Sequence, residues 1–250
     1  MLKNHRLRLI TFAALFAALA AGAVLLTPVL YDRGWLQFNH PDKERFPVRG
    51  LDVSHHQGVI DWPLVGRSEY RFVYIKATEG GDFTDPQFHR NWKASEEAGL
   101  IRGAYHFYTL CRPGRDQAEH LIRTVPGAHM LPPAIDLEFG GNCSKRPARE
   151  EFNRELNQFL DMIQAHYGTE PILYTTEEFF KAYGDPSWMK RLWIRDIFFE
   201  PDDFPGWIFW QYYSRASVPG INGPVDVNVF YGTEADLHGL ILQEKIDNDR

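Results

Sequence analysis

Two carboxylates lie two residues apart at the end of an apolar, proline-bounded run, LPPAIDLE, which covers residues 131–138. Side chains alternate between the two faces of a strand, so Asp136 and Glu138 point the same way. Such acids are costly to bury, because each must be solvated, paired or protonated. Cleavage of a glycosidic bond is one chemistry that needs a pair of carboxyl groups. The alternative is a solvated strand end, where Asp and Glu are ordinary residues.

Eight strand-like runs follow one another along the chain, separated by helical or turn-rich segments. They are GLDVS (50–54), FVYIKA (72–77), GAYHFY (103–108), PPAID (132–136), PILYT (171–175), RLWI (191–194), WIFWQY (207–212) and VDVNVF (225–230). Strands that alternate with helices are typical of a parallel sheet covered by helices.

Helices are predicted mainly in the first part of the chain. Residues 88–98 end at a glycine, and residues 115–124 end before a proline. Residues 152–163 place apolar side chains at helical spacing, and Gly168 supplies a stop. Residues 180–225 are poor in helical pattern and rich in Trp, Pro and Gly. We therefore predict an α/β fold, a single modified TIM-like barrel with reduced helices in its second half.

In such a barrel the chemistry lies at the carboxyl ends of the strands, and polar residues gather there. These residues are Asp52, Lys76, Asp136, Glu138, Tyr174, Gln211 and Asp226. Asp52 and Asp226 belong to the first and last strands, which are neighbours in a closed barrel. Each alone has the alternative of a cap or turn residue. Beside the acids of residues 131–138 they would complete a floor of four carboxylates, which could raise the pKa of one member enough for it to act as an acid.

Aromatic side chains accompany these strand ends, and an acidic cleft with aromatic walls suits a sugar better than a phosphate. We expect the substrate to contact Lys76, Tyr105, Tyr174, Trp210 and Gln211. His55 and His56 suggest a metal, but adjacent residues diverge and no further ligand spacing accompanies them. The chain has neither a GxSxG nucleophile motif nor a glycine-rich phosphate loop. We therefore predict no metal and no cofactor.

The N-terminus has the character of a membrane-targeting segment. Lys3, Arg6 and Arg8 precede an uncharged run of 22 residues, Leu9 to Leu30, which is long enough to cross about 30 Å of hydrocarbon. Basic residues on this side keep the N-terminus cytoplasmic, so the rest of the chain is exported. We predict an uncleaved anchor over residues 1–30, a linker or packed arm over 31–47 and a catalytic domain over 48–250. A cleaved signal peptide and a secreted domain are the alternative.

The exported part carries a net charge of about −9, which argues against a nucleic-acid partner. Its length suits one large domain, which we expect to be monomeric. The only two cysteines, Cys111 and Cys143, each lie just after a strand-like run. In an oxidising compartment we expect them to form a disulfide.

Several segments together resemble the glycoside hydrolase family 25 lysozymes, the Chalaropsis-type muramidases. They are DVSHHQGVIDW, YIKATEGGDFTDPQF, GAYHFY, AIDLE, LWI, FWQY and VDVNVF, in that order. The resemblance covers about residues 48–232. It implies a modified barrel that cleaves the β-1,4 bond between N-acetylmuramic acid and N-acetylglucosamine in peptidoglycan.

By position, the resemblance makes Glu138 the proton donor and Asp136 its partner acid, with Asp52 and Asp226 as the acids of the first and last strands. Two segments depart from the family pattern: YTTEEFF after the fifth strand, and Arg195 after LWI, where a small residue is usual. Two other functions stay open: a barrel glycosidase that acts on chitin-like chains, and a non-catalytic protein that binds cell-wall glycan.

Overall fold

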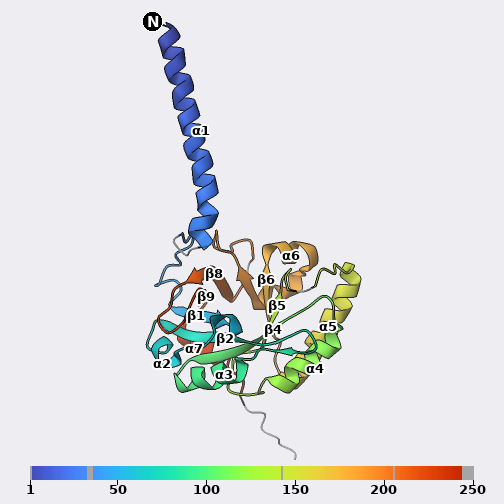
Figure 1. Ribbon diagram of the computed structural model, residues 1–250. Coiled ribbons are helices and arrows are strands. Elements are labelled where there is room, and N and C mark those ends of the chain that lie inside the picture. Colours follow the sequence, from blue (N-terminus) through green and yellow to red (C-terminus); the bar gives the residue numbers. More distant parts are fainter. Residues whose placement is uncertain (1, 33–35, 142, 205, 244–250) are drawn as a thin grey trace, which may run out of the picture. The chain divides into compact units, whose positions relative to one another are not determined.

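The computed structural model describes residues 2–32, 36–141, 143–204 and 206–243 (Figure 1). The chain divides into two compact units, Met1–Gln37 and Phe38–Arg250. The predicted domain extends to residue 250, and its residues 244–250 lie outside the described part.

The first unit consists of helix α1, Leu2–Asp32. Its segment Ile10–Tyr31 has 22 residues and a mean hydropathy of 2.2, so its length and composition suffice to cross a membrane. Pro28 lies inside the helix, and the hydroxyl of the preceding residue, Thr27, donates a hydrogen bond of 2.8 Å to the carbonyl oxygen of Ala23, one turn earlier. A signal sequence would have the same length and composition.

The second unit is built on a sheet that contains every predicted strand. Its strands are β1 (Val48–Val53), β2 (Tyr70–Glu79), β3 (Phe83–Thr84), β4 (Ile101–Phe107), β5 (Ala134–Leu137), β6 (Ile172–Thr176), β7 (Leu192–Arg195), β8 (Phe209–Ala216) and β9 (Val225–Phe230). The short β3, which the sequence pattern did not indicate, pairs with the end of β2 as a hairpin.

Eight of these strands close into a barrel. The order is β1-β9-β8-β7-β6-β5-β4-β2, and β1 also pairs with β2. All neighbours are parallel except β9, which is antiparallel to both β8 and β1. The open end of the barrel, where the parallel strands finish, is called the mouth here, and the other end the base. Because β9 runs in reverse, its first residues lie at the mouth.

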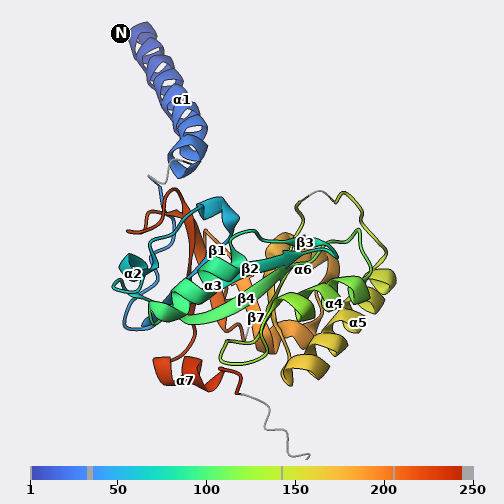
Figure 2. The ribbon, with the colours of Figure 1, turned by 60° about the horizontal axis from the view of Figure 1, so that its bottom comes forward.

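The helices agree with the predicted pattern. The longer ones are α3 (Phe88–Glu97), α4 (Gly114–Thr124) and α5 (Arg149–Tyr167). Helices α4 and α5 lie side by side on one flank of the barrel (Figures 1 and 2). They approach closely at Gly114, where an added Cβ would lie 1.9 Å from the carbonyl oxygen of Glu155. Helix α5 ends at Gly168, which adopts the left-handed conformation with φ of 74°.

The remaining helices are short, as expected for those of the second half, and two short ones also follow β1. They are η1 (His55–Gln57), α2 (Trp62–Val65), α6 (Glu177–Tyr183), η2 (Pro186–Arg191) and α7 (Glu234–Gly239). Among the described residues between β7 and β9, no helix covers the sheet.

Large apolar side chains fill the barrel and seal its base. Phe72, Phe209 and Trp193 are buried in the interior, and Leu237 of α7 joins the same cluster from below. Figures 1 and 2 show α7 at the end of the barrel opposite α6. The interior is therefore a packed core below an open mouth.

Residues 38–47, predicted as part of a linker or packed arm, belong to the barrel unit. Asn39 donates a hydrogen bond of 3.4 Å to the carbonyl oxygen of Asp196, which follows β7 at the mouth. Phe46 is buried against Trp207 at the base of the barrel. This segment is an arm that runs down the outside of the barrel from mouth to base.

Candidate active site

The four predicted acids meet at the mouth. Asp136 lies in β5 and Glu138 immediately follows that strand, so the alternation of side chains turns both inward. Asp52 lies near the end of β1 and pairs in register with Asp226 of the antiparallel β9. The reversed strand thus brings a carboxylate from its first residues to the level of the acids at the ends of the parallel strands.

The acids line a cleft of about 430 Å³. It contains four of the five predicted substrate contacts, namely Lys76, Tyr105, Tyr174 and Gln211. Side chains that the sequence did not single out as contacts complete the lining: Ser54, His56, Phe107, Trp193, Arg195 and Ser214.

Trp210, the fifth predicted contact, is not brought to the cleft. It is buried, and its Nε1 donates a hydrogen bond of 2.8 Å to the carbonyl oxygen of Asp196. Its ring packs on Trp207 and on Phe46 of the arm. Adjacent side chains of a strand face opposite sides, so Gln211 lies in the cleft and Trp210 points out of the barrel. The tryptophan that does line the cleft is Trp193 of β7.

Asp52 is held by a network of side-chain hydrogen bonds. Its Oδ2 accepts from Gln211 Nε2 at 2.9 Å and from Asn228 Nδ2 at 2.7 Å. The Tyr174 hydroxyl donates to Gln211 Oε1 at 3.0 Å, and Trp193 Nε1 donates to Asn228 Oδ1 at 2.8 Å. Two residues predicted to contact substrate, Tyr174 and Gln211, therefore also fix the orientation of this carboxylate.

Burial raises the pKa of all four acids. For Asp136 it raises the pKa well above the usual range, and repulsion from Glu138 adds to the effect. Its Oδ1 has no hydrogen-bond partner among the described residues. Burial also raises the pKa of Glu138, while Arg195 and Lys76 oppose the rise. Interacting carboxyls titrate together, so the cluster keeps protons at a pH where isolated acids would lose them.

Asp52 and Asp226 share a hydrogen bond. Burial and the charge of Asp52 raise the pKa of Asp226 well above the ordinary value. Burial also raises the pKa of Asp52, but the bonds it accepts from Asn228, Gln211 and Asp226 counter the rise. Asp226 is thus the proton donor of this pair, and Asp52 the acceptor.

Two cations face the acids. Lys76 forms an ion pair of 2.7 Å with Glu79 and lies 4.9 Å from the centroid of the Phe107 ring. Arg195 lowers the pKa of Glu138 and of Asp226. The sequence marked Arg195 only as a departure from the family pattern, yet an arginine at the end of a barrel strand was itself a usable signal.

The two histidines after β1 have separate surroundings. His55 Nδ1 lies 2.8 Å from an oxygen of the buried Asp85, whereas His56 lines the cleft. Within the described chain, no group of three or more His, Cys, Asp or Glu side chains is arranged to hold a metal ion.

Cys111 and Cys143 form a disulfide, with their Cα atoms 5.8 Å apart. It joins the loop after β4 to the loop after β5, five residues beyond Glu138. The bond therefore ties the segment that follows β5 to the loop that follows β4.

A closed barrel with clustered, proton-retaining carboxyls at its mouth is the arrangement of a barrel glycoside hydrolase. The sequence model of glycosyl hydrolases family 25 matches residues 51–221. The chain belongs to this family.

Solved and curated relatives agree with this assignment. A family 25 glycosyl hydrolase from Bacillus anthracis is 37% identical, with a TM-score of 0.76 over 82% of this chain and 97% of that one. The uncharacterized protein YegX of Escherichia coli K12 is 36% identical over 78% of this chain and 74% of its own length. Lysozyme M1 of Streptomyces globisporus is 34% identical over 77% of this chain and 71% of its own.

Proposed function

We propose that the protein is a lysozyme, an N-acetylmuramidase that cleaves the β-1,4 bond between N-acetylmuramic acid and N-acetylglucosamine in peptidoglycan. The observation that carries the proposal is the pair of inward-facing acids at the end of β5, both with raised pKa, in a chain of family 25. The name of the relative from Streptomyces globisporus, lysozyme M1, supports the same activity.

The proposed reaction uses Glu138 as the proton donor. In its protonated form it transfers a proton to the glycosidic oxygen as the bond breaks, and the resulting carboxylate then takes a proton from the attacking water. Asp136 stabilises the positive charge that develops on the sugar or on the nitrogen of a participating 2-acetamido group. We expect net retention of configuration.

The other acids act through the field and through substrate contacts. Asp52, held by Gln211 and Asn228, supplies a fixed negative charge near the reacting carbon. Lys76, Tyr105, Tyr174 and Gln211 offer polar groups to the sugar hydroxyls from the cleft wall. Trp193 borders the cleft in place of the predicted Trp210, but it is only 2% exposed, and its part is to hold Asn228, which in turn holds Asp52.

The experiment is a digest of purified peptidoglycan, followed by borohydride reduction and mass spectrometry of the fragments. Reduced muramic acid at the new ends supports the proposal. Reduced glucosamine would assign the activity to the other class of glycosidase, which acts on chitin-like chains. Binding without any new reducing ends would identify a non-catalytic glycan-binding protein.

We also propose that α1 anchors the enzyme in a membrane, with the barrel on the exported side as a monomer. The support is the apolar segment Ile10–Tyr31 behind a basic start. Peptidoglycan lies outside the cytoplasm, so an exported barrel is where the proposed substrate is.

A further inference from the structure

The loops joined by the disulfide form a raised border beside the cleft, which we call the bridged wall. It comprises residues 110–113 after β4 and residues 143–147 after β5. The exported part of the chain is acidic overall, yet the wall contains Arg112, Lys145 and Arg146 and no acid. Carboxylates of neighbouring segments, Asp82 and Glu151, pair with two of these cations, so the wall favours an anionic ligand that can replace those partners.

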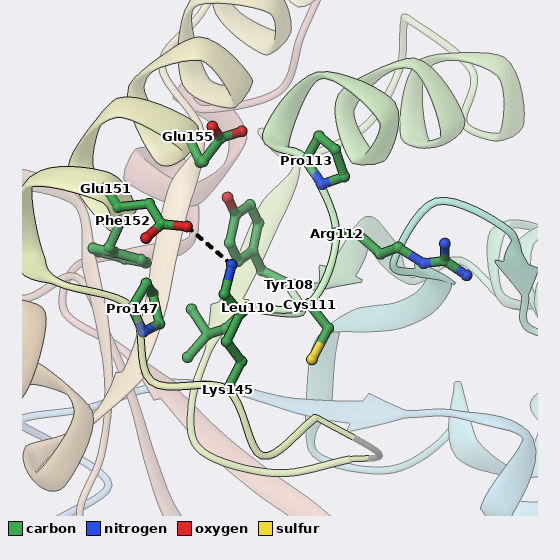
Figure 3. A pocket seen from close by; sticks show the side chains of 10 residues that line it. All are labelled: Tyr108, Leu110, Cys111, Arg112, Pro113, Lys145, Pro147, Glu151, Phe152 and Glu155. Carbon is green, nitrogen blue, oxygen red and sulfur yellow. Dashed lines mark hydrogen bonds and ion pairs between the residues drawn. The ribbon is translucent and has the colours of Figure 1, made fainter.

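Hollows lie on both sides of this wall. One, of about 500 Å³, lies between the β2–β3 hairpin and the disulfide and is lined by Glu79, Phe83 and Arg112 among others. The other, of about 240 Å³, has buried Tyr108 and Phe152 in its lining, and Lys145 extends into it (Figure 3). Cys111 and Arg112 line both hollows, so the two are adjacent.

The first hollow adjoins the active site. Lys76 lines the catalytic cleft, and its ion-pair partner Glu79 lines the hollow. Gly141, two residues before Cys143, is close to both, since an added Cβ there would be 3.2 Å from the Phe107 ring and 3.4 Å from Glu79. The Lys76–Glu79 pair therefore connects the cleft to the first hollow, and Arg112 connects that hollow to the one that Lys145 lines.

Arg112 and Lys145 form exposed ion pairs, and a ligand carboxylate could replace the partner in each. Arg112 lies 3.1 Å from Asp82, with both side chains more than half exposed. Lys145 lies 2.9 Å from Glu151, and both are again exposed. Exposed ion pairs contribute little to stability, so exchanging Asp82 or Glu151 for an incoming carboxylate costs little. The planar guanidinium of Arg112 also suits a carboxylate geometrically.

We propose that the bridged wall is a subsite for the peptide stems of peptidoglycan, in which Arg112 and Lys145 pair with stem carboxylates. The inference rests on the proposed function, because that function places muramic acid, the sugar that carries the stem, beside Glu138. The stem is the anionic peptide that is covalently held next to the wall, so it reaches these cations at high effective concentration.

The test compares two forms of one substrate: soluble, uncross-linked glycan strands with their peptide stems, and the same strands after an amidase has removed the stems. The readout is the ratio of kcat/KM on stem-bearing strands to kcat/KM on stripped strands, measured with the full-length protein in detergent. Each cation exchanges one exposed partner for another, so the worth of two exposed ion pairs is an upper bound, and we expect a wild-type ratio above one and no more than about 25. Raising the salt concentration lowers that ratio.

Three variants locate the effect. In Arg112→Gln/Lys145→Gln the ratio falls to about one and no longer depends on salt. Asp82→Asn removes the carboxylate that competes for Arg112, so the ratio rises above that of the wild type. The matched control Lys93→Gln/Arg123→Gln removes two equally exposed cations from α3 and α4, away from the wall, and keeps the wild-type ratio.

The outcomes separate this inference from the proposed function. A wild-type protein that cleaves neither form contradicts the proposed function. A protein that cleaves both forms with a ratio of one contradicts only the stem subsite. The subsite is also overturned if the double variant keeps the wild-type ratio. The same holds if its kcat/KM falls equally on stem-bearing and stripped strands, because the ratio is then unchanged.

Discussion

Glu138 lies one residue beyond the last residue of β5, where its carboxyl faces the cleft and the three other acids. We predict that Glu138→Gln, which keeps the shape but removes the transferable proton, lowers kcat by about 10²- to 10⁴-fold. Asp136→Asn is also severe, whereas Asp52→Asn and Asp226→Asn are milder. Rates on solubilised peptidoglycan measure the loss, and circular dichroism verifies the fold. A variant within a few-fold of the wild type would refute the assigned role.

The activity has a matching pH dependence. The proton donor must be protonated, so the rate falls as pH rises through the pKa of Glu138, which burial raises. We therefore expect the alkaline limb of the kcat profile to lie above the pKa of an ordinary glutamate, about 4.3. A limb at that ordinary value would show that burial does not tune this acid.

Burial of the Asp226 carboxyl also lowers the free energy of unfolding at neutral pH. The folded-state pKa of Asp226 lies above its unfolded value, so the folded state binds the proton more tightly. The contribution of Asp226 to stability is then fully present below about pH 4 and declines as pH rises toward its folded-state pKa. Asp226→Asn keeps a donor for Asp52 and removes this decline.

We predict that Asp226→Asn raises Tm at pH 7 and leaves it unchanged at pH 3. A shift of about 2–4 °C would correspond to about 1 kcal/mol for a domain of this size. Thermal unfolding at the two pH values decides the point. Equal shifts at both would show that the cause is packing and not charge.

For single residues, the sequence predicted the positions of the four acids correctly but not which tryptophan lines the cleft. Strand alternation was enough to pair Asp136 with Glu138. The choice between Trp210 and Trp193 depends on which face of each strand turns inward. FWQY carries aromatic side chains on both faces, and the arm covers its outer one. Without the arm in view, the sequence pattern could not assign the faces of β8.

Among the elements, the strands and helices were largely predictable because each has its own period and stop signals. The direction of β9 was not predictable, because VDVNVF reads the same whichever way it pairs. That direction decides whether Asp226 lies at the mouth or at the base. The sequence thus indicated Asp226, because the last strand neighbours β1. The reversed direction of β9 explains why Asp226 lies at the mouth, level with Asp52.

The disulfide between the loops at the mouth can be tested by thiol labelling. The two cysteines are 32 residues apart, and closing a loop of that size contributes about 3.7 kcal/mol by chain entropy. We expect neither thiol to be alkylated in the unreduced, denatured protein, and both to be alkylated after reduction. Labelling of both before reduction, followed by mass spectrometry, would contradict the bond.

For the whole molecule, the open question is the fate of α1. We predict that the membrane-extracted protein keeps its first thirty residues, because the apolar run continues past the small residues around Ala18 to Ala23. Intact mass measures this directly. Loss of about twenty residues would identify a cleaved signal and a secreted enzyme. The barrel unit should be active in either form, because its core and cleft are made from residues 38–243.

The described chain enters and leaves the barrel unit at opposite ends of the barrel, because the arm starts at the mouth and β9 runs in reverse. The point at which a carrier is attached therefore decides which end of the barrel it lies beside. The described chain enters the barrel unit beside Asp196 at the mouth and, after β9 has run back down, continues through α7 at the base. A carrier, dye or solid support joined beyond α7 therefore leaves the cleft facing outward. An attachment at Phe38 itself would lie at the mouth, beside the residues that follow β7, so we expect immobilisation at the two positions to give unequal activity on polymeric substrate.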